Sequence, residues 1–388
     1  MHAPPAPRRR TPRPRSHIVL AHDWLCGLRG GERVLDRIAS VAGEIGEVRD
    51  VLAMFDDGRP LTPAIDGLRH HVASLGRMPG AQRLRRWMLP LYPAAVSQLG
   101  EILARLHKDR PIDLVISTSS AAIKGLRTPA GVPHLCYCHS PARYLWSRQE
   151  DYGGGMAGRL RLAGLAAFGP PLRAWDRRSA DNVTRFVANS THVAEQIQEF
   201  YDRDATVVHP PVRTEVFTPD PLRGRGGHWL AVGALEPYKR FDRAIEAARA
   251  AGRELRIIGG GSQRERLERL APEGVRFLGH VDEAQLVDEM RAAGVLLFPQ
   301  IEDFGIVAVE AQACGLPVAA TARGGATDIV IDGVTGALCD GTPDELARAA
   351  ERAEACDPRL CWANAQDYRQ SHFDEAMREE IRKTLRAS

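Results

Sequence analysis

Two glutamates around a glycine turn form the part of this chain best suited to chemistry. Glu302 and Glu310 are separated by seven residues, Asp303-Phe304-Gly305-Ile306-Val307-Ala308-Val309. Gly305 lets another backbone or a ligand come close because it has no Cβ, and the apolar run from Ile306 predicts a buried helix. Glu302 then lies at the helix N-terminus, where free amides favour anions, and Glu310 lies about two turns deeper. Such a site suits a ligand that joins a diphosphate to sugar hydroxyls.

Two cations follow another predicted strand. Lys239 and Arg240 come shortly after the apolar run at residues 229–233. Cations at a strand-to-helix turn can clamp a diphosphate and stabilise the charge that grows as it leaves. The alternative is that they are ordinary surface cations at the start of a helix.

The first half of the chain contributes a glycine loop and a histidine. Gly30 and Gly31 follow the first predicted strand, and paired glycines let backbone amides approach an anion. Their spacing is not Gly-x-Gly-x-x-Gly, which argues against a dinucleotide cofactor. His139 follows the predicted strand at residues 135–138 and precedes a proline, so we expect it to point into a cleft. Arg143, four residues further, is a candidate to hold a phosphate or an acceptor.

Two neighbouring strand ends in the second half carry little side-chain bulk. Gly260 stands at the end of the predicted strand at residues 255–259, and Val281 follows the one at residues 275–278. Adjacent strand ends of this kind leave a slot in which backbone groups can hold a flat base. The sequence does not indicate which base fits.

Together these segments resemble the retaining, GT-B-fold glycosyltransferases of family 4 (glycosyl transferases group 1), over nearly the whole chain after residue 15. The segment from Glu302 to Glu310 is similar to the family's double-glutamate signature. The string His139-Ser140-Pro141-Ala142-Arg143-Tyr144-Leu145-Trp146 looks like bacterial mannosyltransferases. This chain departs from the family at Ala234, where an arginine is usual, but it keeps the lysine of the same turn as Lys239.

The resemblance implies a role for each candidate. His139 would contact the transferred sugar, Glu302 its hydroxyls and Glu310 the ribose, while the amides of Phe304 and Gly305 would hold the diphosphate with Lys239. The implied catalytic residues are His139, Glu302 and Lys239. The implied donor-binding residues are Gly30, Gly31, Lys239, Arg240, Gly260, Val281, Phe304, Gly305, Ile306 and Glu310. The family uses no cofactor, and we expect no metal requirement.

Strands alternate with helices along the chain, which predicts an α/β protein with parallel sheets covered on both faces. Five predicted strands precede a proline-rich stretch, near residues 18–21, 113–117, 135–138, 186–189 and 207–212, and five follow it, near 229–233, 255–259, 275–278, 295–298 and 318–320. We therefore expect a GT-B architecture, with two Rossmann-like doubly wound domains and a cleft between the carboxyl ends of their strands.

The expected domains have definite boundaries. Residues 1–15 form a basic, proline-rich tail that we expect to be disordered. Residues 16–212 form an acceptor-binding domain and residues 222–370 a nucleotide-sugar donor-binding domain. By analogy with the family, the C-terminal helix at residues 374–388 packs back on the first domain.

Composition limits the possible partners of the protein and the cellular compartment in which we expect it. A net charge of +3 does not by itself imply a nucleic-acid partner, and seven irregularly spaced cysteines indicate a reducing compartment without a disulfide framework. No apolar run reaches the length of a membrane span, so we expect a cytoplasmic protein. Residues 83–92 and 159–168 mix arginines with large apolar side chains, which fits either peripheral membrane contact or helices that pack on the sheet while their arginines reach solvent.

The sequence therefore predicts a retaining hexosyltransferase. It would move a hexose, first of all mannose from GDP-mannose, from a nucleoside-diphosphate sugar to a hydroxyl of a glycan or a polyprenyl-linked glycan, in cell-surface polysaccharide synthesis. Two alternatives remain. One is a nucleotide-sugar epimerase of the same fold, and the other is a non-catalytic nucleotide-sugar-binding scaffold.

Overall fold

The structure is a computed structural model. It describes residues 15–147, 155–220, 222 and 224–387, apart from the side chains of residues 82, 83, 86, 155–163 and 165. The expected N-terminal tail lies outside the described residues except for Arg15, as do most side chains of the arginine-rich stretch at residues 159–168.

The first domain is built on a seven-stranded parallel sheet with the order β3-β2-β1-β4-β5-β6-β7. Its strands are β1 (Ser16–Leu25), β2 (Gly46–Asp56), β3 (Arg69–Val72), β4 (Leu114–Ser119), β5 (His134–Cys138), β6 (Arg185–Ala188) and β7 (Ala205–Val207). The strand order reverses between β1 and β4, which is where open α/β sheets form a crevice at the carboxyl ends of their strands.

The second domain repeats this plan with six parallel strands in the order β10-β9-β8-β11-β12-β13. They are β8 (Trp229–Val232), β9 (Leu255–Ile258), β10 (Val275–Gly279), β11 (Val295–Phe298), β12 (Val318–Thr321) and β13 (Gly336–Cys339). Here the order reverses between β8 and β11. The expectation of two doubly wound, Rossmann-like domains is confirmed.

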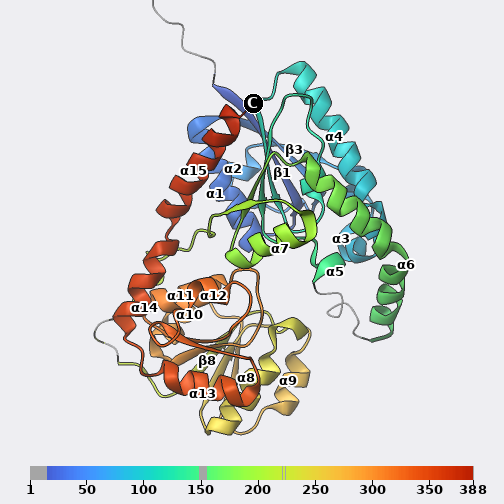
Figure 1. The fold of residues 1–388 in the computed structure, drawn as a ribbon. Helices are drawn as coiled ribbons and strands as arrows, with labels where there is room; N and C mark the ends of the chain where they lie inside the picture. Colours follow the sequence, from blue (N-terminus) through green and yellow to red (C-terminus); the bar gives the residue numbers. More distant parts are fainter. Residues whose placement is uncertain (1–14, 148–154, 221, 223, 388) are drawn as a thin grey trace, which may run out of the picture.

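Helices cover both sheets (Figure 1). Those before β8 are α1 (Gly30–Ile45), α2 (Pro63–Asp66), α3 (Ala81–Leu84), α4 (Tyr92–Asp109), α5 (Arg143–Trp146), α6 (Gly155–Ser179) and α7 (Thr191–Tyr201). Those after β8 are α8 (Phe241–Ala251), α9 (Arg264–Leu270), α10 (Glu283–Ala292), α11 (Ile306–Ala313), α12 (Ala326–Ile329), α13 (Pro343–Ala353), α14 (Pro358–Ala365) and α15 (Gln370–Arg386). Strands buried from both sides explain the continuous apolar runs of the sequence; β4 and β5, for example, are buried along their whole length.

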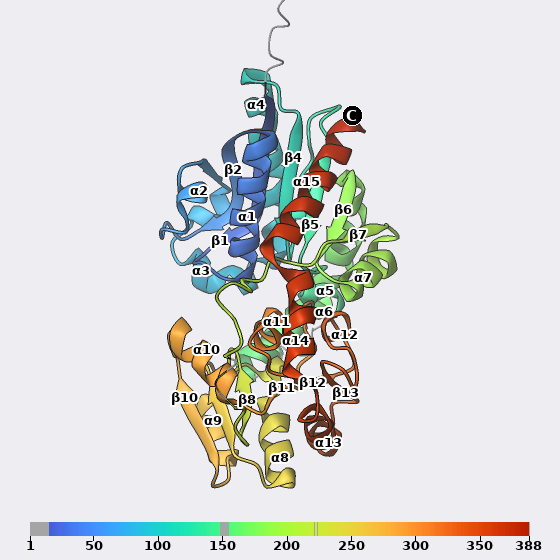
Figure 2. The ribbon, with the colours of Figure 1, turned by 90° about the vertical axis from the view of Figure 1, so that its left-hand side faces the viewer.

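The C-terminal helix α15 returns to the first domain and lies beside α1 and β5 (Figure 2). Its Phe373, Met377 and Ile381 are buried in the core formed with strands of the first sheet. The ring of Phe373 meets that of Tyr137 edge-on, with centroids 5.8 Å apart. An ion pair between Arg37 and Asp374 adds a polar contact at the start of the helix. The last segment of the chain thus ties the two domains together.

Two expectations about strands are corrected. The strand expected to continue to residue 212 ends at Val207, because Pro210 and Pro211 have no N–H to give to a sheet. Strands β2, β3 and β13 were not expected. In β2, Asp50 is completely buried and accepts hydrogen bonds from Arg69 and His71 of β3, each 2.8 Å long. Burying an ionised carboxylate costs much free energy unless it is paired and hydrogen-bonded, and here the partner strand β3 supplies the donors.

Candidate active site

The predicted catalytic residues meet in a pocket between the two domains, which we call the central pocket. It has a volume of about 410 Å³. The first domain lines it with residues that include Gly30, Gly31, His139 and Arg143, and the second with residues that include Tyr238, Lys239 and the segment from Glu302 to Val307.

His139 stands directly after β5 and presents an imidazole nitrogen to this pocket. Its Nε2 atom is buried and has no hydrogen-bond partner among the described residues. A Cβ placed on Gly31 would lie 3.7 Å from this nitrogen, so the glycine loop borders the imidazole closely. Burial, helped by the charges of His22 and Arg143, lowers the pKa of His139 to about 3. His139 is therefore neutral at physiological pH, with a ring nitrogen available to a hydroxyl.

His22 is a pocket residue that sequence reasoning missed. It stands near the end of β1, is 4% exposed, and its Cε1 atom also lies 3.7 Å from the Cβ position of Gly31. Its Nδ1 atom contacts Thr118, at 2.5 Å from Oγ1 and 3.1 Å from the carbonyl oxygen. Because a carbonyl oxygen only accepts, Nδ1 carries the proton and Nε2 does not. Its position at the carboxyl end of the first strand, just before the glycine loop, was the available signal.

Lys239 and Glu302 form an ion pair in the central pocket. Lys239 ends a short 3₁₀ turn after β8, and Glu302 lies in the loop after β11, where it also accepts a hydrogen bond of 3.1 Å from Gln300. Burial alone would raise the pKa of Glu302, but Lys239, with help from Gln300 and Arg143, lowers that pKa overall. An ionised carboxylate and an ammonium group thus lie side by side in the pocket that His139 also lines.

The turn at Gly305 brings the second domain against the glycine loop of the first. Gly305 has a φ of 111°, which disfavours any other residue, and a Cβ there would lie 2.9 Å from the ring of Phe298. The next residue, Ile306, opens helix α11, and its Cδ1 atom lies 3.6 Å from the Cβ position of Gly30. The glycine loop of the first domain and the start of α11 in the second therefore border the same space. That this space holds an anion stays a prediction.

Glu310 lines a neighbouring pocket of about 540 Å³, the outer pocket, which shares Gly30 and Ile306 with the central one. The Glu310 side chain is 9% exposed. Burial raises its pKa to about 7, against the opposing charges of Arg213 and Arg33. The two glutamates of the signature thus face two adjoining pockets.

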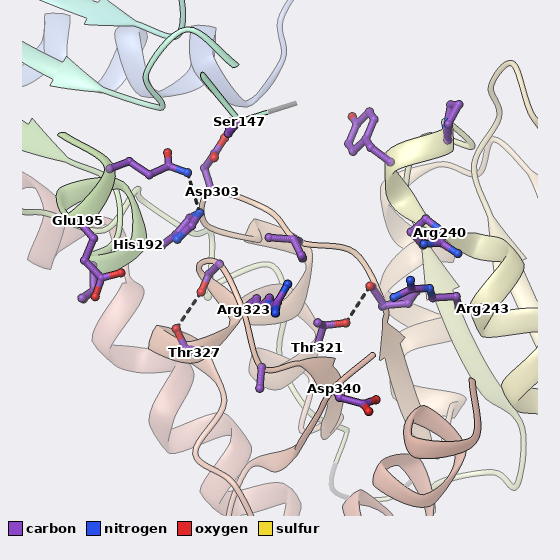
Figure 3. A pocket seen from close by; sticks show the side chains of 18 residues that line it. Ser147, His192, Glu195, Arg240, Arg243, Asp303, Thr321, Arg323, Thr327 and Asp340 are labelled. Atoms are coloured by element: carbon purple, nitrogen blue, oxygen red, sulfur yellow. Dashed lines mark hydrogen bonds between the residues drawn. The ribbon is translucent and has the colours of Figure 1, made fainter. Parts of the chain in front are cut away.

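Arg240 lies elsewhere, in a third pocket of about 780 Å³ that shares Tyr238 and Asp303 with the central one. Figure 3 shows Arg240 and Arg243 on one side of this pocket and His192 and Glu195 on the other. The Arg240 backbone has a φ of 52°, and its guanidinium pairs with Asp242 at 2.9 Å. Arg240 therefore does not stand beside Lys239 in the central pocket.

The expected base slot lies outside all three pockets. Val281 packs against the core of the second domain. Gly260 lies against the imidazole of His280, whose Nε2 would be 2.6 Å from a Cβ on Gly260. The two strand ends are adjacent, as expected, and the exposed imidazole of His280 lies against Gly260.

Arg143 joins the two domains. Its guanidinium forms an ion pair with Asp303 of the second domain. Burial alone would lower the pKa of Arg143, but Asp303 raises it overall. The cation that we considered for a phosphate or an acceptor is therefore paired with a carboxylate of the second domain in this structure.

Metal sites and membrane spans were also considered. Across the part of the chain that the structure describes, no group of three or more His, Cys, Asp or Glu side chains is placed to hold a metal ion. None of the helices among the described residues combines the length and apolar character needed to cross a bilayer.

Comparison with solved structures shows the fold. Sucrose-phosphate synthase from Thermosynechococcus elongatus has a TM-score of 0.71 and 19% identity, covering 96% of this chain and all of that one. The lipopolysaccharide outer core galactosyltransferase WaaB has a TM-score of 0.68 and 16% identity, covering 95% of this chain and 99% of that one. HepE from Anabaena in complex with UDP also scores 0.68, with 18% identity and coverages of 94% and 99%. These likenesses confirm the GT-B fold.

Sequence comparison shows the family. The D-inositol 3-phosphate glycosyltransferase of Mycolicibacterium smegmatis is 36% identical over 269 residues, which are 61% of this chain and 62% of that protein. The protein of the same name from Mycobacterium sp. (strain JLS) is 37% identical over 197 residues, 44% and 45% of the two chains. These matches thus span 45% to 62% of the relatives' length. The family model for Glycosyl transferases group 1 matches residues 219–369, and that for Glycosyltransferase Family 4 matches residues 13–216. This chain therefore belongs to glycosyltransferase family 4.

Proposed function

We propose that this chain transfers a hexose, with retention of configuration and without a metal, from a nucleoside-diphosphate sugar to a hydroxyl of a glycan or lipid-linked glycan. Family membership supports the reaction class. The observation that carries the proposal is the central pocket, which neutral His139, the glycine loop and the Lys239–Glu302 pair all line.

In this proposal the chain's own groups bind the donor and stabilise the leaving diphosphate. Lys239 and the amides around Gly30 and Gly305 neutralise its charge. As Lys239 turns to the phosphate, Glu302 is released to accept hydrogen bonds from sugar hydroxyls, and His139 Nε2 contacts another hydroxyl. The bond from the anomeric carbon to the phosphate oxygen breaks and its electron pair leaves with the diphosphate. The acceptor oxygen attacks on the same face, and its proton passes to the leaving oxygen.

The proposal also specifies which nucleotide sugar is the donor and which acceptors should be assayed. Mannose from GDP-mannose rests on two sequence strings, the one at His139 and Tyr238-Lys239-Arg240-Phe241-Asp242. The neighbour HepE was solved with UDP and with UDP-glucose, so uridine nucleotides are the first comparison. The relatives' name, D-inositol 3-phosphate glycosyltransferase, adds a phosphorylated cyclic polyol to the acceptors to be assayed.

The deciding experiment measures the affinities of GDP, UDP, ADP and their sugar conjugates by calorimetry, with and without EDTA, followed by sugar-transfer assays with the conjugate that binds. We expect one nucleotide to bind independently of EDTA. Lys239→Met should weaken that binding by about 10- to 100-fold, because a charge-assisted hydrogen bond contributes about 1.5–3 kcal/mol. Lys108→Met, at the exposed end of α4, is the matched control. Arg240→Met should have the smaller effect, because its guanidinium pairs with Asp242.

Other outcomes point to other functions. Binding without turnover would support the scaffold alternative, and isomerisation of the bound sugar without transfer would support the epimerase. If no nucleotide binds, or if Lys239→Met binds as well as the unchanged chain, the proposed use of the central pocket is wrong.

A further inference from the structure

A cluster of exposed apolar side chains stands on the first domain between β3 and α4. Met78, Leu84, Trp87 and Leu91 are between 47% and 50% exposed. Twelve large hydrophobic side chains are exposed among the described residues, and these four fall within 14 consecutive positions, residues 78–91. Scattered exposed apolar residues are normal in a globular protein, but a cluster marks a contact surface. We call residues 77–91 the basic apolar turn.

Local structure explains why this segment keeps an outward apolar side. It consists of short pieces, with α3 and the 3₁₀ turns Ser74–Arg77, Arg85–Trp87 and Leu89–Leu91. Ala81, Met88 and Leu89 pack against the core of the first domain and fix the segment there. The four exposed residues are therefore additional to the three that pack into the core of the domain.

The charge around these residues has one sign. Along the chain, residues 67–100 contain five arginines, at positions 69, 77, 83, 85 and 86, and no Asp or Glu, although the whole chain has 52 cationic and 49 acidic residues. Arg69 pairs with the buried Asp50 of β2, which leaves the four arginines at positions 77–86 for this segment. Arg77 is exposed at the start of the turn. Arginines interleaved with Trp and Leu complement a surface that has anionic groups above an apolar layer.

The turn borders the candidate active site. The guanidinium of Arg85 lies over the indole ring of Trp24, with its central carbon 5.6 Å from the ring centroid. Trp24 in turn lines the central pocket. In Figure 2, α3 lies at the end of the first domain that faces the second. The apolar cluster is thus connected through one side chain to the first-domain wall of the pocket.

We infer that the basic apolar turn docks the chain on an anionic lipid bilayer. Leu84, Trp87 and Leu91 enter the boundary between headgroups and acyl chains, while Arg77 and Arg85 contact lipid phosphates. The first-domain side of the central pocket then opens beside the membrane surface, where a lipid-anchored acceptor is held. The docking itself does not depend on the proposed transferase function.

Vesicle flotation of the full chain tests this inference. We expect binding to vesicles of phosphatidylglycerol and phosphatidylcholine, little binding to phosphatidylcholine alone, and weaker binding as salt screens the arginines. The triple variant Leu84→Ser/Trp87→Ser/Leu91→Ser should lower partitioning by about tenfold or more, because the apolar insertion is lost. The control is Leu360→Ser/Trp362→Ser on α14, whose side chains are 48% and 41% exposed.

The outcomes separate docking from misfolding and from other partners. Both variants should keep the melting temperature and the nucleotide affinity of the unchanged chain, because none of the five residues lines the central or outer pocket. Absence of binding to anionic vesicles would overturn the inference. The inference would also be wrong if the triple variant bound anionic vesicles as well as the unchanged chain, because the affinity would then come from cations elsewhere. The same holds if the control variant lost as much binding as the triple variant.

Discussion

At Glu310, burial brings the ionisation of a predicted ribose-binding carboxylate into the neutral range. The pKa of Glu310 is raised from an ordinary value of 4.5 to about 7. A ribose hydroxyl donates to the ionised form, so we expect affinity for a nucleotide sugar to rise between pH 6 and pH 8, by up to about tenfold. Calorimetry with the sugar conjugate measures this, since its substituted diphosphate does not titrate in this range. Glu310→Gln should bind more weakly and without this pH dependence.

The same shift has a consequence for stability. Because the folded pKa is raised, the stability contributed by protonated Glu310 is complete below pH 4.5 and is lost as the pH rises through about 7. Glu310→Gln should therefore unfold at a higher temperature than the unchanged chain at pH 8.5 and at a similar temperature at pH 4.5. Glu265→Gln, on α9, is the control. For the binding prediction of the preceding paragraph, the contradicting outcome is an affinity of Glu310→Gln that changes with pH as much as that of the unchanged chain. Another group would then be the one that titrates.

Residue by residue, the sequence predicted part of the site. It placed Lys239 and Glu302 in one site, although 63 positions separate them, because both follow strands whose carboxyl ends meet at one edge of the second sheet. It missed His22, whose ring is held by Thr118 of the neighbouring strand β4. It put Arg240 beside Lys239, whereas a left-handed backbone at Arg240 turns it toward Asp242. Strand order is visible in a sequence, but the direction of a side chain after a turn is not.

At the scale of elements, one buried carboxylate connects strand β1 of the first domain with the loop after β4. Asp23, near the end of β1, accepts four backbone N–H groups from residues 120–123 at 2.6 to 2.9 Å. Ser120 of this loop lines the central pocket. Asp23→Asn replaces one acceptor oxygen by an NH₂ group and leaves two buried N–H groups unpaired. It should lower the free energy of unfolding by about 2–6 kcal/mol, at about 1–3 kcal/mol for each group.

Denaturant unfolding of Asp23→Asn checks this expectation, with Asp109→Asn at the exposed end of α4 as the control. A loss no larger than that of the control would contradict the proposed importance of the four contacts. If the variant remains folded at low temperature, we also expect slower sugar transfer, because the loop that carries Ser120 would shift.

The apolar patterns of the individual strands explain which of them could be predicted from the sequence. Strands such as β5 and β11 are short apolar runs between turn signals, and buried parallel strands require that pattern. Strand β2 was missed because Asp50 interrupts its run, and its donors Arg69 and His71 come from β3. The final helix α15 was placed on the first domain by analogy alone, since its contacts with α1 depend on the three-dimensional path of the chain.

At the scale of the whole molecule, polar contacts across the cleft hold the two domains together. Asp328 of the second domain accepts hydrogen bonds from the backbone N–H of Thr191, at 2.7 Å, and from His209 Nε2, at 3.1 Å. Close by, Ser190 donates to the carbonyl oxygen of Asp303, whose carboxylate pairs with Arg143. Burial alone would raise the pKa of Asp328, but His209 and Thr191 lower it overall, so the carboxylate is ionised. These contacts favour the closed cleft.

Removing the Asp328 contacts should therefore shift the ligand-free chain toward an open cleft. We expect Asp328→Ala to have a larger radius of gyration by small-angle scattering, and saturating nucleotide sugar to restore the smaller value, because a ligand that contacts both domains favours the closed state. The nucleotide sugar should also bind more weakly, since part of its binding free energy now drives closure. Asp344→Ala, on the exposed side of α13, should change neither quantity. An unchanged radius in Asp328→Ala would mean that α15 and the Arg143–Asp303 pair hold the domains closed without this carboxylate.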